Sequence, residues 1–103
     1  MQFLFSDCYS LISLDLSYFK TGNVKYMNNM FSNCSSLVSI ILSNLDTSKV
    51  GTLNFIFSGC SSLVSIDLTS FNTESVDNMN NMFSGCSSLV SLNLSNFINL
   101  SFI

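Results

Sequence analysis

The residues of this chain with the clearest potential for chemistry are four cysteines, because thiolates bind metals and pair in disulfides. Cys8, Cys34, Cys60 and Cys86 lie 26 residues apart. If they occupy one position of a repeated unit, they form a column whose side chains point the same way. Thiolates in a line cannot surround a tetrahedral metal ion, and parallel side chains do not meet as a disulfide requires. We therefore expect free thiols that fill a small apolar slot, and no metal site.

Acid–base catalysis is the second chemistry to consider, and its usual residues are sparse. The chain has no histidine, and its six carboxylates are scattered over different positions of the 26-residue period. Asp15 and Asp67 share a position but are two periods apart, roughly 10 Å at the strand spacing of a sheet, which is too far for a shared proton. The glycines are single turn residues rather than a phosphate-binding loop. We expect a protein that is not an enzyme and that carries no cofactor.

The cysteine spacing belongs to a repeat that covers the whole chain. The stretch from Phe57 to Leu68 has versions that begin at Phe5, Phe31 and Phe83. Such a fixed period is typical of arrays of stacked units. We expect one array, with full copies at residues 5–30, 31–56 and 57–82, a partial copy four at 83–103, and the end of a preceding copy at 1–4. Neither end has a polar closing copy, which favours either a fragment of a longer array or a short protein whose ends stack on another chain.

The first half of each copy is expected to form a strand. Ile66 and Leu68 alternate with Ser65, Asp67 and Thr69, and a period of two is typical of a strand with one buried face. The equivalent apolar pairs in the other copies are Leu14 and Leu16, Ile40 and Leu42, and Leu92 and Leu94.

The second half of each copy is expected to form a short helical turn. Val76, Met79, Met82 and Phe83 follow the spacing of a helical or 3₁₀ segment. One position after it suits a left-handed residue at a turn or helix end, and its occupants are Asp7, Asn33, Gly59 and Gly85. The predicted fold class is an α/β repeat solenoid of about four stacked coils with uncapped ends, each coil a short strand plus a short helical turn.

Stacking of the copies is expected to bury the apolar positions. In copy three these are Phe57, Cys60, Leu63, Val64, Ile66, Leu68, Phe71, Val76, Met79 and Met82. The phenylalanines that open the copies (Phe5, Phe31, Phe57 and Phe83) and the four cysteines are expected to form structural ladders. One copy alone buries too little apolar surface to offset its chain entropy, so stability should depend on contacts between copies.

Composition limits the kinds of partner. Hydrophobic residues make up 48% of the 103 positions and charged residues 9%, while serine and asparagine supply 22 and 13. The net charge is -3, and the only basic residues are Lys20, Lys25 and Lys49, which disfavours nucleic acid and anionic membrane surfaces. No apolar run approaches the roughly 18 residues of a membrane span, and the first residues lack the pattern of a signal peptide. If the protein is exported, we expect its signal outside this chain.

Two sequence frames resemble known repeats. Leu63, Ile66 and Leu68 fit the leucine-rich-repeat frame, and the stretch from Met82 to Leu89 resembles the bacterial surface-protein 26-residue repeat (mycoplasma lipoprotein-type repeat), which is related to BspA-like leucine-rich-repeat surface antigens. The resemblance covers nearly the whole chain. It implies a leucine-rich-repeat-like solenoid at the cell surface or outside the cell, with adhesion to host or neighbouring cells as the usual role.

The outward positions of the expected strands form the candidate binding face. They are Ser13, Asp15, Ser39, Ile41, Ser65, Asp67, Ser91 and Asn93. Ile41 is apolar among polar neighbours and could anchor a partner, although single exposed isoleucines are common. We expect a non-enzymatic module that binds a protein or glycan of a host or neighbouring cell through this face. The alternatives are a structural spacer or self-assembling rod that associates end to end, or a fragment of a longer surface protein without a separate function.

Overall fold

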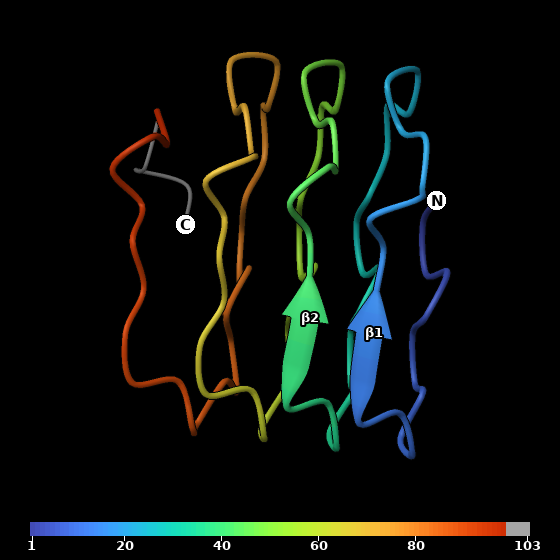
Figure 1. The fold of residues 1–103 in the computed structure, drawn as a ribbon. Helices are drawn as coiled ribbons and strands as arrows, with labels where there is room; N and C mark the ends of the chain where they lie inside the picture. Colours follow the sequence, from blue (N-terminus) through green and yellow to red (C-terminus); the bar gives the residue numbers. More distant parts are fainter. Residues whose placement is uncertain (99–103) are drawn as a thin grey trace.

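The chain winds in successive turns of 26 residues that lie side by side, as Figure 1 shows. The computed structural model describes residues 1–98. Each turn has two long sides, joined by a loop at either end. One side carries the short strands, and the other carries isolated bridges between copies, such as Tyr26 with Thr52 and Thr52 with Asn78.

The strands are fewer than the alternating pattern predicts. β1 (Ser13–Asp15) and β2 (Ser39–Ile41) pair in parallel, and in both the middle side chain is partly buried while its neighbours are exposed. The corresponding residues 65–67 and 91–93 keep this alternation of burial without forming a strand. The predicted strand is therefore present in copies one and two, and the prediction is wrong for copies three and four.

The predicted helical turns are absent, because residues 1–98 contain no helix and only these two short parallel strands. The expected α/β leucine-rich-repeat-like solenoid is therefore wrong as a fold class. Consecutive tight turns take the place of the helix. In copy one and the start of copy two, Met30 N–H donates to the Met27 carbonyl at 3.3 Å and Cys34 N–H donates to the Phe31 carbonyl at 3.2 Å.

Left-handed residues explain why these turns do not continue into a helix. Asn29 (φ 59°) and Asn33 (φ 62°) each occupy the third position of a turn, where a type II turn requires a positive φ. Two left-handed residues four positions apart interrupt any right-handed helix. The equivalent residues are Phe3, Phe55 and Asn81 in the first column, and Asp7, Gly59 and Gly85 in the second. The second column is the one for which the sequence predicts left-handed residues, and that prediction is confirmed.

Every second backbone N–H group of these turns bonds to the next copy, and the N–H groups between them close the turns within their own copy. We call residues 1–7, 27–33, 53–59 and 79–85 the turn side. On it, the N–H groups of Asn29, Phe31 and Asn33 donate to carbonyls of residues 54, 56 and 58 at 2.9, 2.9 and 2.7 Å. The same bonds recur one copy earlier and one copy later. Since alternate N–H groups are satisfied by a neighbouring copy, a helix would have no advantage in hydrogen bonding here.

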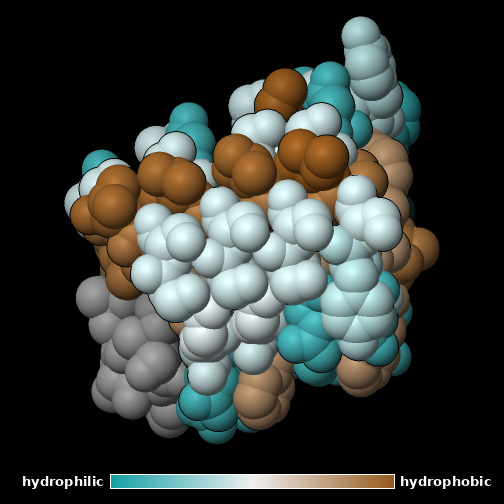
Figure 2. Space-filling model, turned by 90° about the horizontal axis from the view of Figure 1, so that it is seen from below, coloured by the Kyte–Doolittle hydropathy of each residue, from teal (hydrophilic) through white to brown (hydrophobic). Residues whose placement is uncertain are grey.

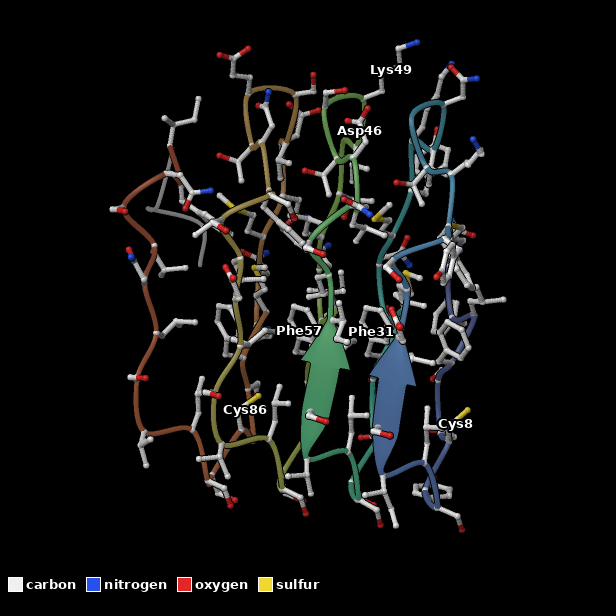
Figure 3. The ribbon with its side chains drawn as sticks, in the orientation of Figure 1. Cys8, Phe31, Asp46, Lys49, Phe57 and Cys86 are labelled. Carbon is white, nitrogen blue, oxygen red and sulfur yellow. The ribbon has the colours of Figure 1, made fainter. Side chains whose placement is uncertain are left out.

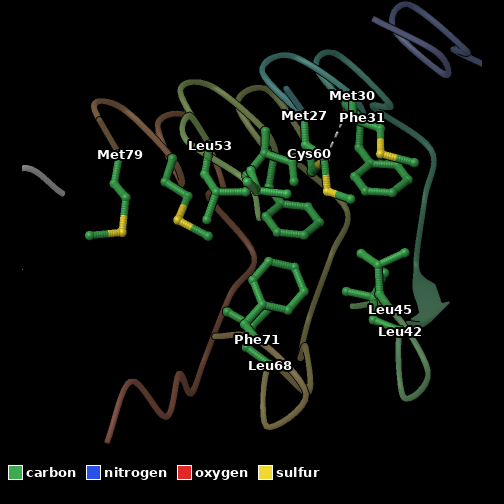
Figure 4. Packing of buried hydrophobic residues seen from close by; sticks show 14 of the residues in the cluster. Met27, Met30, Phe31, Leu42, Leu45, Leu53, Cys60, Leu68, Phe71 and Met79 are labelled. Carbon is green, nitrogen blue, oxygen red and sulfur yellow. Dashed lines mark hydrogen bonds between the residues drawn. The ribbon is translucent and has the colours of Figure 1, made fainter. Parts of the chain in front are cut away.

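The interior between the two long sides is apolar. Figure 4 shows Met27, Leu53 and Met79 from successive copies in a row, next to Phe31. Of the ten positions of copy three that were expected to be buried, eight are buried. The exceptions are Val64, which is 43% exposed, and Ile66, which is partly buried.

A column of buried threonines links the loops of neighbouring copies. The hydroxyl of Thr47, which is fully buried, donates to the Asn72 carbonyl at 2.9 Å and accepts the Asn72 N–H at 2.8 Å. Thr21 makes the same pair of bonds with Asp46. This column was not predicted from the sequence, although threonine recurs every 26 residues at positions 21, 47 and 73.

Candidate functional site

The candidate binding face lies on the strand side of the stack. All eight of its predicted residues are exposed. The register of β1 and β2 places Ser13 opposite Ser39 and Asp15 opposite Ile41, so these four residues are neighbours. The residues of copies three and four occupy the equivalent positions (Figure 1). We call this set of eight residues the strand face.

The carboxylates of the strand face are held by local hydrogen bonds. Asp67 accepts bonds from the Thr69 hydroxyl at 2.7 Å and the Thr69 N–H at 3.0 Å, and these two bonds lower the pKa of Asp67. Hydrogen bonds from the hydroxyl and the N–H of Ser17 lower the pKa of Asp15 in the same way. Both side chains are therefore charged at neutral pH, with fixed orientations on an exposed surface.

Asn93 and Ile41 complete the column to which the two carboxylates belong. The side chain of Asn93 accepts the Ser95 N–H at 2.9 Å, so it repeats the local bond without the charge. Ile41 cannot make this bond, and its side chain is 49% exposed between the copies that carry Asp15 and Asp67. The column thus presents hydrogen-bond acceptors on either side of one apolar group.

The four cysteines are free, and they fall into two environments. Cys34 and Cys60 are buried as expected, whereas Cys8 and Cys86 are only partly buried; Figure 3 labels these two in the first and last copies. The thiol of Cys60 donates to the Phe31 carbonyl at 3.2 Å (Figure 4). Burial is the main cause that raises the pKa of Cys34 to about 11 and of Cys60 to about 12. These thiols are neutral at physiological pH and are poor nucleophiles.

The phenylalanine column is a continuous aromatic stack. The ring centroids of Phe5 and Phe31 are 5.8 Å apart, those of Phe31 and Phe57 are 5.3 Å apart, and those of Phe57 and Phe83 are 5.8 Å apart. The planes of each pair lie within 7° of parallel. Phe31 and Phe57 are fully buried between the two long sides, as Figure 3 shows. This geometry gives the column a structural role in joining the copies.

One surface feature was missed by the sequence analysis. The residue just before each strand position is aliphatic and exposed in every copy: Ile12 is 64% exposed, Val38 47%, Val64 43% and Val90 78%. We call these four residues the apolar ridge. Figure 2 shows a row of hydrophobic side chains crossing one face of the molecule, bordered by pale, weakly polar ones. The 26-residue recurrence of an aliphatic residue directly after a buried or half-buried leucine was the available signal.

The arrangement offers surfaces rather than cavities. Within residues 1–98 there is no pocket, and no cluster of three or more cysteine or acidic residues could hold a metal ion. None of the described segments is a helix suited to crossing a membrane. At the loops, Asp46 accepts the Ser48 N–H, and Lys49 donates to the side chain of Asn23 at 3.1 Å (Figure 3). Within residues 1–98, the eight residues of the strand face are all exposed.

The similarity of this chain to known proteins lies at the level of a family. Neither curated proteins nor solved structures show a significant similarity to this chain. A family model described as "Mycoplasma protein of unknown function, DUF285" matches residues 1–101, which is nearly the whole length. The chain therefore belongs to this Mycoplasma-associated repeat family.

Proposed function

We propose that the chain is a non-enzymatic binding module displayed on the cell surface or outside the cell. In this proposal the repeat is the bacterial surface-protein type related to BspA-like leucine-rich-repeat antigens. The partner is a protein or glycan of a host or neighbouring cell, and it binds the strand face. The observation that carries the proposal is the set of eight exposed side chains repeated at equivalent positions of four copies.

The chemistry of the strand face suits a hydrogen-bonding partner. Each copy supplies a serine hydroxyl, at Ser13, Ser39, Ser65 and Ser91, and three copies supply an oriented carboxylate or amide. A partner with several hydroxyl or amide groups, such as a glycan chain or an extended peptide, could bond to several copies at once. Ile41 adds one apolar contact of the kind that anchors an interface.

A double substitution tests the strand face. Ile41→Lys with Asp67→Ala replaces the apolar contact and removes one carboxylate, and both side chains are exposed, so the fold should survive. We expect binding to surface proteins or glycans, identified by a microarray screen of wild-type protein, to fall at least about tenfold.

The matched control is Tyr26→Lys with Asp46→Ala. Tyr26 is exposed on the opposite long side, and Asp46 makes the same local bond to Ser48 that Asp67 makes to Thr69. This control should bind like wild type. Equal binding by the strand-face variant and the control would exclude the strand face as the site.

Location is tested separately by protease shaving of intact cells that produce the protein. Release of its peptides without release of a cytoplasmic marker is the expected result. Protection until lysis would contradict surface display and with it the adhesion role.

A structural spacer or rod is a second candidate, favoured by the edge of the stack that residues 1–4 and copy one form. This edge exposes Phe3 (54%), Leu4 (50%) and Phe19 (36%), whereas Met30, in the column of Leu4, is 0% exposed and Phe71, in the column of Phe19, is 3% exposed. Stacking of another chain on this edge would cover these side chains. Sedimentation velocity should then show species larger than dimers, and Phe3→Ser with Leu4→Ser should abolish them. A chain that stays monomeric would exclude the rod.

A further inference from the structure

The apolar ridge is a continuous row. The Val38 N–H donates to the Ile12 carbonyl at 2.8 Å, and the Val90 N–H donates to the Val64 carbonyl at 3.1 Å, so the backbones of these pairs are in direct contact. Figure 2 shows the row running across the copies on one face. Single exposed apolar residues are ordinary, but a contiguous apolar row is typical of an interaction site.

The ridge lies in the part of the surface that carries no charge. Residues 8–14, 34–40, 60–66 and 86–92 contain no Asp, Glu, Lys or Arg. All nine charged residues of the chain lie outside these segments, and the net charge is -3. A charged partner would find no ion pair within these segments, whereas another acidic chain could approach them without meeting a charge that they carry.

The regular repeat also favours a second molecule of this chain as the partner. A partner needs apolar groups at the spacing of the stacked copies. A second molecule of this chain has that spacing because it has the same repeats. Copies two and three have the identical sequence Cys-Ser-Ser-Leu-Val-Ser-Ile around the ridge, and copy four differs only in its last residue. A two-fold axis across the ridge would place Ile12 of one molecule opposite Val90 of the second molecule, and Val38 opposite Val64 of the second molecule.

We propose that two molecules of this chain pair laterally, with the ridge of one against the ridge of the other in antiparallel orientation. A stable interface covers roughly 800 Å² on each partner. The chain exposes 5331 Å² in total, and the four side chains of the ridge are a small part of it. The pairing is therefore weak, and it strengthens with each additional copy that contributes to the ridge. It does not depend on a ligand at the strand face.

Sedimentation velocity of the full chain over roughly 1 μM to 1 mM tests the pairing, because this range covers weak interfaces. The weight-average mass should rise from that of the 11.4 kDa monomer toward twice that value and no further. Val38→Asp or Val38→Lys should raise the dissociation constant at least about tenfold, with unchanged circular dichroism. Tyr26→Lys, on the opposite long side, is the matched control and should associate like wild type.

Mixing experiments test the antiparallel arrangement. A mixture of Val38→Asp with Val64→Lys brings opposite charges face to face, so it should associate more tightly than a mixture of Val38→Asp with Val38→Lys. The reverse order would overturn the arrangement. A wild-type chain that stays monomeric at about 1 mM, or a Val38→Lys variant that pairs like wild type, would overturn the proposal itself. Loss of association only in Phe3→Ser with Leu4→Ser would assign the contact to the edge of the stack instead.

Discussion

The two long sides of each turn hold the stack together to very different degrees. On the turn side, every copy is bonded to the next through backbone N–H groups, as in the bonds from Phe31 to Ile56 at 2.9 Å and from Phe57 to Met82 at 3.0 Å. On the strand side, the paired strands within residues 1–98 are β1 and β2 alone. The aromatic stack and the buried thiols belong to, or directly adjoin, the turn side.

The contacts that join the copies and the exposed polar groups therefore lie in separate parts of the same repeat. The turn side repeats closely because each copy must fit its neighbours. The strand face can change residue type, as Ile41 does beside Asp15, because its side chains contact solvent. Substitutions on the turn side should therefore affect stability, and substitutions on the strand face should leave it nearly unchanged.

The largest expected effect comes from the aromatic stack. Phe57→Ala removes a fully buried ring between two stacked neighbours and should lower the free energy of unfolding by about 3–5 kcal/mol. Ile41→Ala on the strand face should change it by less than about 0.5 kcal/mol. Urea unfolding followed by circular dichroism measures both. If Phe57→Ala does not fold, Phe57→Leu gives a milder loss; equal values for Phe57→Leu and Ile41→Ala would contradict the comparison.

A smaller loss is expected from the buried threonine column, which joins the loops between the two sides. Thr47→Val leaves the N–H and the carbonyl of Asn72 without their partner, at a cost of about 1–3 kcal/mol. Thr47→Ser keeps the hydroxyl and should recover most of this loss. Thermal unfolding of both variants distinguishes the lost hydrogen bonds from a change in packing, because a packing effect would make the serine variant the less stable one.

Alkaline pH should lower the stability of the stack through the buried thiol of Cys60, which adjoins the turn side. The unfolded Cys60 thiol loses its proton near its usual pKa of 9.0, while the folded thiol keeps it up to about 12, so stability falls as the pH rises between these values. Cys60→Ser can still donate to the Phe31 carbonyl but does not ionise. Relative to neutral pH, wild type should lose about 1.4 kcal/mol more than Cys60→Ser by roughly pH 10. Urea unfolding measures both proteins as the pH rises, and an equal loss of unfolding free energy in wild type and Cys60→Ser would refute this role of burial.

The strand face should respond at the opposite end of the pH scale. The hydrogen bonds from Thr69 lower the pKa of Asp67 below its usual value of 3.8. The small contribution of these bonds to the free energy of unfolding is therefore present above pH 3.8 and is lost as the pH falls below that value.

The last expected effect is a modest gain in stability. Phe55 holds a left-handed conformation (φ 57°) on the turn side, where its counterparts Asn29 and Asn81 suit that conformation better. Phe55→Asn should raise the free energy of unfolding by about 1 kcal/mol, and Asn29→Phe should lower it by a similar amount. Loss of stability in Phe55→Asn would mean that packing of the partly exposed ring stabilises the fold by more than the left-handed backbone conformation destabilises it.

Much of the repeat could be predicted from sequence. The period, the ladders of Phe57 and Cys60 in the interior, and the left-handed residues at Asn33 and Gly59 follow directly from residue types at a fixed spacing. The exposure of the strand face followed from the alternation of serine with aliphatic residues. These features depend on side chains, which a sequence displays.

The backbone hydrogen bonds could not be predicted in the same way. The spacing of Met79, Met82 and Phe83 indicates which side chains are buried, and both a helix and a series of turns satisfy it. Turns are distinguished from a helix by the additional column of residues with a positive φ. Only Asn29 and Asn81 of this column have side chains typical of that conformation, so Phe3 and Phe55 make the column hard to recognise from sequence. The apolar ridge was missed because the adjacent buried leucine made valine look like part of the core.

The direction of the backbone bonds on the turn side gives the stack an electrical polarity. Each of these N–H groups belongs to an earlier copy and points toward a later one, so the peptide dipoles add along the stacking axis, as they do in a helix. The edge near Met1 carries the negative end of this dipole, and the opposite edge carries the positive end. Cations should accumulate at the first edge and anions at the last.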